Sequence, residues 1–223
     1  MAYTPLRPPK APNLLVAPIV YDQRYIDQLN NALRLYFNQI DNGMAFLLSD
    51  TGGSTLSLPH IAASDTADQL ATASNTPTVV KWNTLDSGLG WTLNAPGTAT
   101  ANVSGVYTIR YSLQLANTDN AQHDAAVWLK VNTFDVANST TIFSLPARKS
   151  AGVFSYVCAY SEATFEVEVG DTIALYWATG QAYNTSPATD GVYIEYIAAQ
   201  TSPYPRPAVP SAIGSITFVS RLP

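Results

Sequence analysis

The chain has 223 residues, 47% of them hydrophobic and 12% charged, with a formal net charge of −5; this composition excludes an intrinsically disordered chain and lacks the basic surface typical of nucleic-acid binding. Its single cysteine, Cys158, excludes an intrachain disulfide. No apolar run approaches the roughly 20 residues that span a bilayer and the N-terminus has no signal-peptide core, so we expect assembly in a cytoplasm, no membrane insertion and no nucleic-acid partner.

Residues 1–21 are predicted to form an extended arm. Their prolines fix φ and remove backbone donors, which excludes a helix or a central strand and favours polyproline II. A floppy tail is one alternative. An arm that docks on a partner is the other, and it is favoured because a solvated tail has no use for the apolar residues near the end of this segment: Leu14, Leu15, Val16, Ile19 and Val20.

Residues 22–41 are predicted to form an amphipathic helix. Asp22 is a suitable N-cap, and Asn42 and Gly43 favour a stop. The helix either packs on the chain's own β domain or associates with copies of itself. A narrow apolar seam beside a wide polar face favours the second, a short trimeric stalk. The seam consists of residues at spacings of three and four: Ile26, Leu29, Leu33, Tyr36 and Ile40.

Residues 42–76 open with a short apolar patch and continue into a stretch rich in Gly, Ala, Ser and Thr. We expect a linker with one strand or turn at most. Such a segment gives reach between the helix and the region that follows.

Residues 77–223 are predicted to be entirely β. In 105–116 large apolar residues alternate with polar ones, as in a half-buried antiparallel strand, and 127–131, 165–169, 173–177 and 192–196 repeat the pattern. Residues 212–219 are apolar on both faces, which indicates a central, covered strand. Strands at this spacing, with turn signals between them, predict a mainly β fold, an antiparallel jelly-roll sandwich preceded by an extended arm and one helix.

The chain shows no motif for catalysis or for a cofactor. His60 and His123 lie in no hydrolase or metalloprotease context, and Cys158 is expected to be a buried strand thiol. Glu166 and Glu168 share one strand face, whereas a glycosidase needs carboxylates that face each other across a cleft. No metal-ligand run or phosphate loop is present either. We therefore expect no enzyme, no cofactor and no metal site.

Three short segments of the β region carry a resemblance to a known family: 105–109 (GVYTI), 127–132 (VWLKVN) and 169–173 (VGDTI). They resemble the TNF-like jelly roll found in the globular heads of complement-type proteins. The likeness is closer to a variant in virion structural proteins of tailed phages, on 128–132, the turn 135–139 and the proline-rich run 202–211. The family usually carries glycine where Thr133 and Phe134 stand, so we expect a wider turn there.

The resemblance implies a homotrimer, in which aromatic residues on nominally polar strand faces would be anchors between subunits; Trp128, Tyr176 and Tyr193 are of this kind. It further implies a bacteriophage virion structural protein: a capsid decoration knob, head fibre, or short tail fibre or adaptor. Three N-terminal arms would then meet at one end and bind other virion proteins.

A second hypothesis is a receptor-recognition module that binds a glycan on the host surface. Aromatic and polar side chains in the loops 178–191 and 201–210 would make these contacts. The alternative for each is a simple solvent loop or a subunit contact. The candidate residues are Tyr183, Asn184, Tyr204 and Arg206.

Overall fold

The computed structural model describes residues 9–14, 16, 18–47, 58–185 and 188–222. The chain divides into two units, residues 1–57 and 58–223. Leu15, one of the residues expected to dock on a partner, lies outside the described residues.

The first unit contains the only helix of the described residues, α1 (Gln23–Leu47). Asp22 caps it, because its Oδ1 accepts a hydrogen bond from the Arg24 backbone at 2.9 Å. The helix continues past the stop expected at Asn42 and Gly43. A single glycine costs only about 1 kcal/mol relative to alanine, and the apolar residues that follow it are good helix formers. No helix in the described part of the chain is long and apolar enough to cross a membrane.

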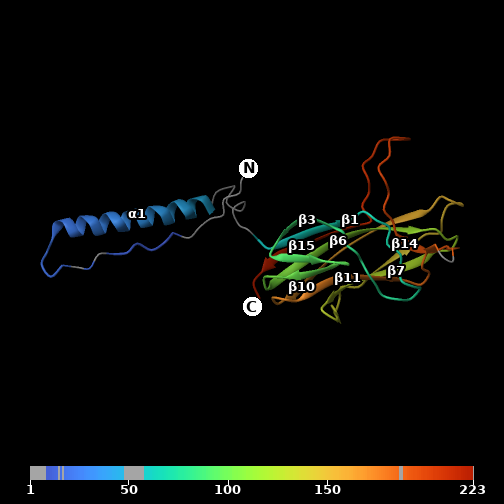
Figure 1. Ribbon diagram of the computed structural model, residues 1–223, viewed down its shortest axis with the longest axis horizontal. Coiled ribbons are helices and arrows are strands. Elements are labelled where there is room, and N and C mark those ends of the chain that lie inside the picture. The colour runs from blue at the N-terminus through green and yellow to red at the C-terminus, as the bar shows by residue number, and fades with distance from the viewer. Residues whose placement is uncertain (1–8, 15, 17, 48–57, 186–187, 223) are drawn as a thin grey trace. The chain divides into compact units, whose positions relative to one another are not determined.

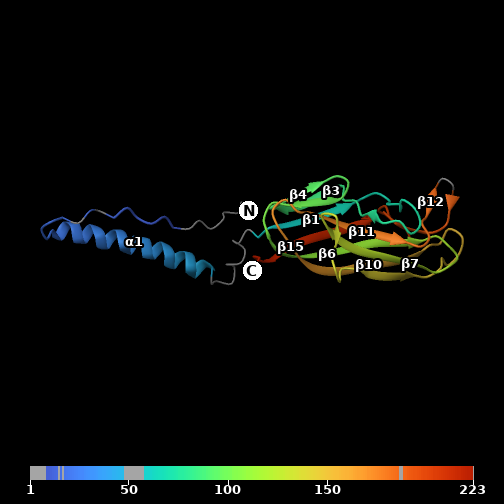
Figure 2. The same ribbon diagram turned by 90° about the horizontal axis from the view of Figure 1, so that it is seen from below.

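The second unit is a sandwich of two antiparallel sheets, whose strands follow one another across the unit in Figure 2. One sheet has the order β10-β6-β15-β1-β3, with β14 also paired to β6, and we call it the β6 sheet. The other has the order β4-β5-β11-β7-β8, with β2 on β11 and β9 on β7, and we call it the β7 sheet. The predicted fold class is confirmed: mainly β, antiparallel and with one helix.

The strands of the β6 sheet are β1 (His60–Asp65), β3 (Thr84–Leu89), β6 (Gly105–Asn117), β10 (Ser155–Val167), β14 (Val192–Ile194) and β15 (Ala212–Ser220). Those of the β7 sheet are β2 (Thr78–Val79), β4 (Trp91–Asn94), β5 (Thr98–Ala101), β7 (His123–Val131), β8 (Phe134–Asp135), β9 (Thr141–Leu145) and β11 (Thr172–Thr179). A short hairpin, β12 (Asn184–Thr185) with β13 (Ala188–Thr189), stands apart.

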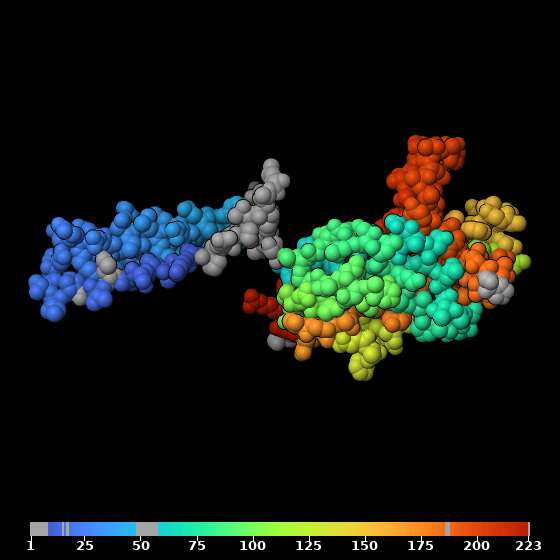
Figure 3. All heavy atoms as spheres, viewed as in Figure 1, coloured from blue at the N-terminus to red at the C-terminus, as the bar shows by residue number. Residues whose placement is uncertain are grey.

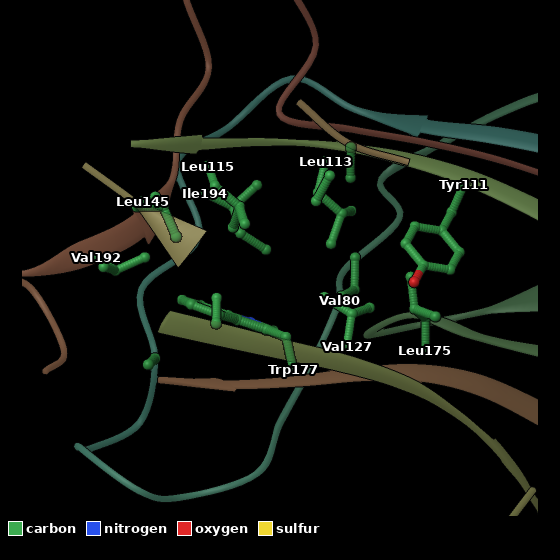
Figure 4. Packing of buried hydrophobic residues seen from close by; sticks show 14 of the residues in the cluster. Val80, Tyr111, Leu113, Leu115, Val127, Leu145, Leu175, Trp177, Val192 and Ile194 are labelled. Carbon is green, nitrogen blue, oxygen red and sulfur yellow. The ribbon is translucent and has the colours of Figure 1, made fainter. Parts of the chain in front are cut away.

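Two apolar clusters fill the space between the sheets. Inward residues of β6 face inward residues of β7 and β11 across it, as Figure 4 shows for Leu113, Val127 and Trp177. A second cluster, which includes Tyr107 and Leu129, continues the core along the same strands. The alternation predicted for 105–116, 127–131 and 173–177 therefore corresponds to one buried face on each strand.

Three local expectations differ from the structure. β1, the one strand for which the expected linker 42–76 left room, pairs with both β15 and β3, so the β unit begins at Leu58 and not at residue 77. β15 is central, but its outer face is not covered, because Ile213 is 47% exposed. The turn between β7 and β8 is tight, with Val131 paired to Phe134, because Asn132 adopts the left-handed conformation (φ 55°) that glycine would otherwise supply.

Candidate interaction surfaces

The seam of α1 is the first candidate surface. No described residue of the helix is buried. Ile26 is exposed, and Leu29, Leu33, Tyr36 and Ile40 are half-buried. Because the helix runs to Leu47, the three-four spacing continues through Gly43 and Leu47 and covers a third heptad. Three heptads are what a coiled coil needs to be identified from sequence.

The flanks of the seam become apolar in the second half of the helix. Phe37 and Met44, on one flank, are 56% and 51% exposed, and Phe46, on the other flank, is 43% exposed. The described residues of the arm are also exposed, with Val16 at 93%, Ile19 at 105% and Val20 at 76%, and Leu14 at 53%. The first unit thus presents a large apolar area to solvent, which is typical of a surface that binds a partner.

The outer face of the β6 sheet is the second candidate surface. The β10 and β6 strands pair without interruption from Ser155 to Val167, so their outward side chains lie in rows across the sheet. Tyr156 and Tyr160 of β10 are 47% and 57% exposed on this face. Arg110 and Glu162 form an ion pair at 3.0 Å. The remaining outward residues of β6 are Val106 and the uncharged Thr108, Ser112, Gln114 and Ala116.

A row of tyrosines crosses one end of this face. In register, Tyr156 of β10 lies opposite Ala116 of β6, and Ala116 lies opposite Tyr193 of β14. Tyr183 extends the row, because its ring centroid lies 4.8 Å from that of Tyr193 at an interplanar angle of 32°. Ala116 is completely buried and Tyr193 is only 6% exposed. We call Tyr156, Tyr193 and Tyr183 the tyrosine row.

A carboxylate adjoins the tyrosine row. Burial, and then the neighbouring carboxylate of Glu195, raise the pKa of Tyr156 to about 12. Burial and the same carboxylate also raise the pKa of Tyr193 far above its ordinary value. Both phenols are therefore neutral at physiological pH and remain able to donate hydrogen bonds. Tyr193 was expected to be an exposed anchor between subunits, but it is already buried within one chain. Tyr156 and Glu195 were not predicted as site residues, although 155–162 alternates outward Tyr156 and Tyr160 with small inward residues.

The four predicted glycan contacts have different surroundings. Tyr183 belongs to the tyrosine row, and Asn184 begins β12. Tyr204 is 62% exposed on the loop 197–209, which the bridges Ile197–Val209 and Gln200–Arg206 tie together and which projects from the domain in Figure 3. The Arg206 guanidinium holds that loop by donating to Ala198 O at 3.0 Å and Pro207 O at 3.2 Å.

The two histidines and the cysteine do not lie together in one site. His123 Nε2 lies 2.7 Å from Asp119 Oδ2, and this hydrogen bond holds the pKa of Asp119 below its usual value. His60 contacts Ser87 Oγ at 3.0 Å and lies elsewhere, on β1. Cys158 is exposed rather than buried, because position 158 faces outward on β10. In the part of the chain that the structure describes, no three His, Cys, Asp or Glu side chains are grouped as metal ligands.

The sequence and the fold of this chain can be compared with those of known proteins. No model of a known protein family matches the sequence, and no curated protein sequence matches it. Solved structures with a similar fold do exist. The globular domain of zebrafish complement 1qA protein has a TM-score of 0.41 and 13% identity, covering 74% of this chain and 99% of that one.

Two further structures show similar values. Murine APRIL has a TM-score of 0.43 and 14% identity, covering 73% of this chain and all of that one. Eiger TNF from S. frugiperda has a TM-score of 0.43 and 14% identity, covering 74% of this chain and 96% of that one.

Proposed function

We propose that the protein is a homotrimeric, non-enzymatic structural component of a bacteriophage virion. It is assembled in the host cytoplasm and attached to the particle through its N-terminal arm and helix. Within this class it is a capsid decoration knob, a head fibre, or a short tail fibre or adaptor. The observation that carries the proposal is α1: three heptads of apolar seam on a helix that buries none of its described residues.

The number of helices follows from the width of the seam. In a pair of helices only the seam positions are fully covered, whereas a third helix also covers the residues on both flanks. Phe37 and Met44 on one flank and Phe46 on the other are apolar and exposed. Three helices remove all of these from water, which supports a trimer over a dimer.

The β domain offers a second surface for the same assembly. The outer face of the β6 sheet carries Tyr156, Tyr160 and Ile213, each close to half exposed. The ion pair between Arg110 and Glu162 on this face is exposed, and its two charges neutralise each other. Exposed ion pairs of this kind contribute little energy in water. The tyrosine end of the face therefore suits burial between copies, where aromatic residues are enriched and charges are depleted, while the exposed Glu166 lies toward its other end.

Light scattering behind a sizing column tests the trimer on the full chain. A mass near three times 23.9 kDa is expected. The double variant Leu29→Asp, Leu33→Asp should lower it, because charges in the seam cannot be buried unpaired. Asn38→Asp, on the polar side of the same helix, is the matched control and should leave the mass unchanged. A monomeric mass for the unaltered chain would refute the proposal.

The attachment to a particle needs a separate test. Phage particles banded by density from a culture that produces this protein should contain it in copies that are a multiple of three, measured by quantitative mass spectrometry. Ile19→Asp with Val20→Asp should remove it from the band while leaving its mass in solution unchanged. Absence of the unaltered protein from the band would contradict the virion role even if the trimer is real.

The second candidate function is recognition of a host-surface glycan. The observation in its favour is the tyrosine row with Glu195, beside the loop that carries Tyr204. Neutral phenols and a carboxylate beside an aromatic pair suit the hydroxyl groups and apolar ring faces of sugars. Glycan-array binding that survives Ile19→Asp, Val20→Asp and is lost in Tyr183→Ala would favour this role over a purely structural one.

A further inference from the structure

The outer face of the β7 sheet carries a second aromatic pair, on the side of the sandwich opposite the β6 sheet. Trp128 of β7 and Tyr176 of β11 are a register pair and stack with centroids 6.1 Å apart at 30°. Lys130 Nζ lies 5.0 Å from the Tyr176 centroid. Asp135 fixes both neighbours, accepting from Trp128 Nε1 at 2.7 Å and from Lys130 Nζ at 3.1 Å. The aromatic pair is thus held in place before any ligand arrives.

A hollow begins where this pair ends. The next register pair on the same face of β7 and β11 is Ala126 with Ala178, so the surface drops from two large rings to two methyl groups. The two alanines form the floor of a hollow of about 270 Å³. This volume lies near the lower end of small-molecule sites, which start at about 300 Å³.

The walls of the hollow come from three elements. Ile142 of β9, paired with Ala126, is 69% exposed and forms one side. Asn75 forms the other side, where its backbone N–H donates to Thr179 O at 2.8 Å. Asp124 closes the far end. The buried Thr179 hydroxyl donates to Asp124 O at 2.9 Å, which ties β7 to β11 beneath the hollow.

The polar groups of the hollow are unoccupied by protein partners. Among the described residues, neither the Asp124 carboxylate nor the Asn75 side-chain amide takes part in a hydrogen bond, and no cationic residue lines the hollow. Asp124 supplies acceptors only, while Asn75 supplies a donor and an acceptor. The hollow therefore offers apolar surface together with partners for hydroxyl groups, and its charge disfavours anions.

We infer that this hollow binds one hexopyranose ring of a neutral glycan. The ring's C–H face packs on the alanine floor and against Ile142. Its rim lies next to the aromatic pair, which adjoins the hollow and whose rings attract the weakly positive hydrogens of C–H groups. Its hydroxyls donate to Asp124 and exchange hydrogen bonds with Asn75. The site is distinct from the tyrosine row, which lies on the other sheet, and it remains open when the β6 sheet faces a trimer axis.

Saturation-transfer NMR on the full chain tests the inference. The probes are the methyl glycosides of glucose, galactose and mannose at millimolar concentration, with glucuronic acid as an anionic comparison. Transfer to the C–H protons of at least one neutral glycoside is expected, with little or none to glucuronic acid. Ala126→Leu, which fills the floor, should weaken binding by roughly tenfold or more. Tyr160→Ala, on the opposite sheet, is the control and should not.

Three outcomes would overturn the inference. The first is no transfer to any neutral glycoside. The second is equal transfer in Ala126→Leu, or a loss in Tyr183→Ala instead, which would move sugar binding to the tyrosine row. The third is a fall in the mass of Ala126→Leu by light scattering, which would make the hollow a contact between copies. Because that variant should leave the trimer intact, failure of the sugar test and failure of the trimer are distinguishable.

Discussion

Tyr160→Ala tests most directly whether the outer face of the β6 sheet is buried between copies of the chain. Tyr160 is 57% exposed on β10, and a buried tyrosine covers about 150–250 Å². An interface on this face therefore removes about 100 Å² of Tyr160 per subunit from water, which contributes about 2.5 kcal/mol at ~25 cal/mol per Å². Alanine keeps the Cβ, so the variant loses about 2 kcal/mol per subunit, or about 6 kcal/mol per trimer.

That loss corresponds to an increase of about 10⁴-fold in the trimer dissociation constant. For a trimer the concentration of half-dissociation follows the square root of this constant, so it should rise about 100-fold. Sedimentation equilibrium over a dilution series measures it. The control is Phe134→Ala, which removes a ring that is 76% exposed on β8 of the opposite sheet. Equal shifts in the two variants, or none in Tyr160→Ala, would refute the assignment of this face.

Three further predictions concern the β domain. Leu113→Ala, at a fully buried core position, should lower the free energy of unfolding in urea by about 2–5 kcal/mol, whereas a change near zero would contradict the core described above. Because the pKa of Tyr156 is raised to about 12, stability that is complete below pH 10 should fall as the pH rises toward 12, and Tyr156→Phe should flatten that part of the profile. Burial raises the pKa of Asp65, although Ala67 N donates a hydrogen bond to its carboxylate. The fold therefore favours the protonated carboxyl, and the stability that this preference contributes is complete below pH 3.8 and is lost as the pH rises. Asp65→Asn keeps an acceptor for Ala67 N. Its free energy of unfolding should therefore rise relative to that of the unaltered chain as the pH increases from 3.8. Parallel pH profiles of the two proteins would show that burying the Asp65 charge does not lower stability.

The strongly alternating strands were predictable from sequence, because their inward and outward residues differ greatly in hydropathy. In β6, Tyr107 and Leu113 are buried and Arg110 between them is exposed, as the pattern predicted. β1 was anticipated only as the one strand that the linker 42–76 could contain, and β3 was not predicted. The inward residues of β1 include Ala63 and Asp65, which carry little apolar signal, and all six residues of β3 are exposed at the edge of the sheet.

Some of the candidate sites were likewise predictable from the sequence, and others were not. The seam of α1 depends only on spacing within one segment, so five of its positions could be identified in advance. The tyrosine row depends on the register of β10 and β14 against β6, which places Tyr156 and Tyr193 on either side of Ala116. The hollow beside Trp128 depends on an alanine pair contributed by two strands. Cross-strand neighbours of this kind are set by the whole fold and not by a local motif.

The uninterrupted pairing of β10 has a consequence for misassembly. β10 is the last strand of its sheet and has 13 residues without a bulge; a long, regular edge strand is a template onto which another chain can add. β9 of the other sheet contacts this strand on its inward side, where Thr141 Oγ1 lies 3.2 Å from Ser161 Oγ. Glu166, which forms no ion pair among the described residues, brings charge to this strand, and this charge opposes stacking of identical strands. Neutralising Glu166 should therefore promote aggregation of the protein without loosening its core.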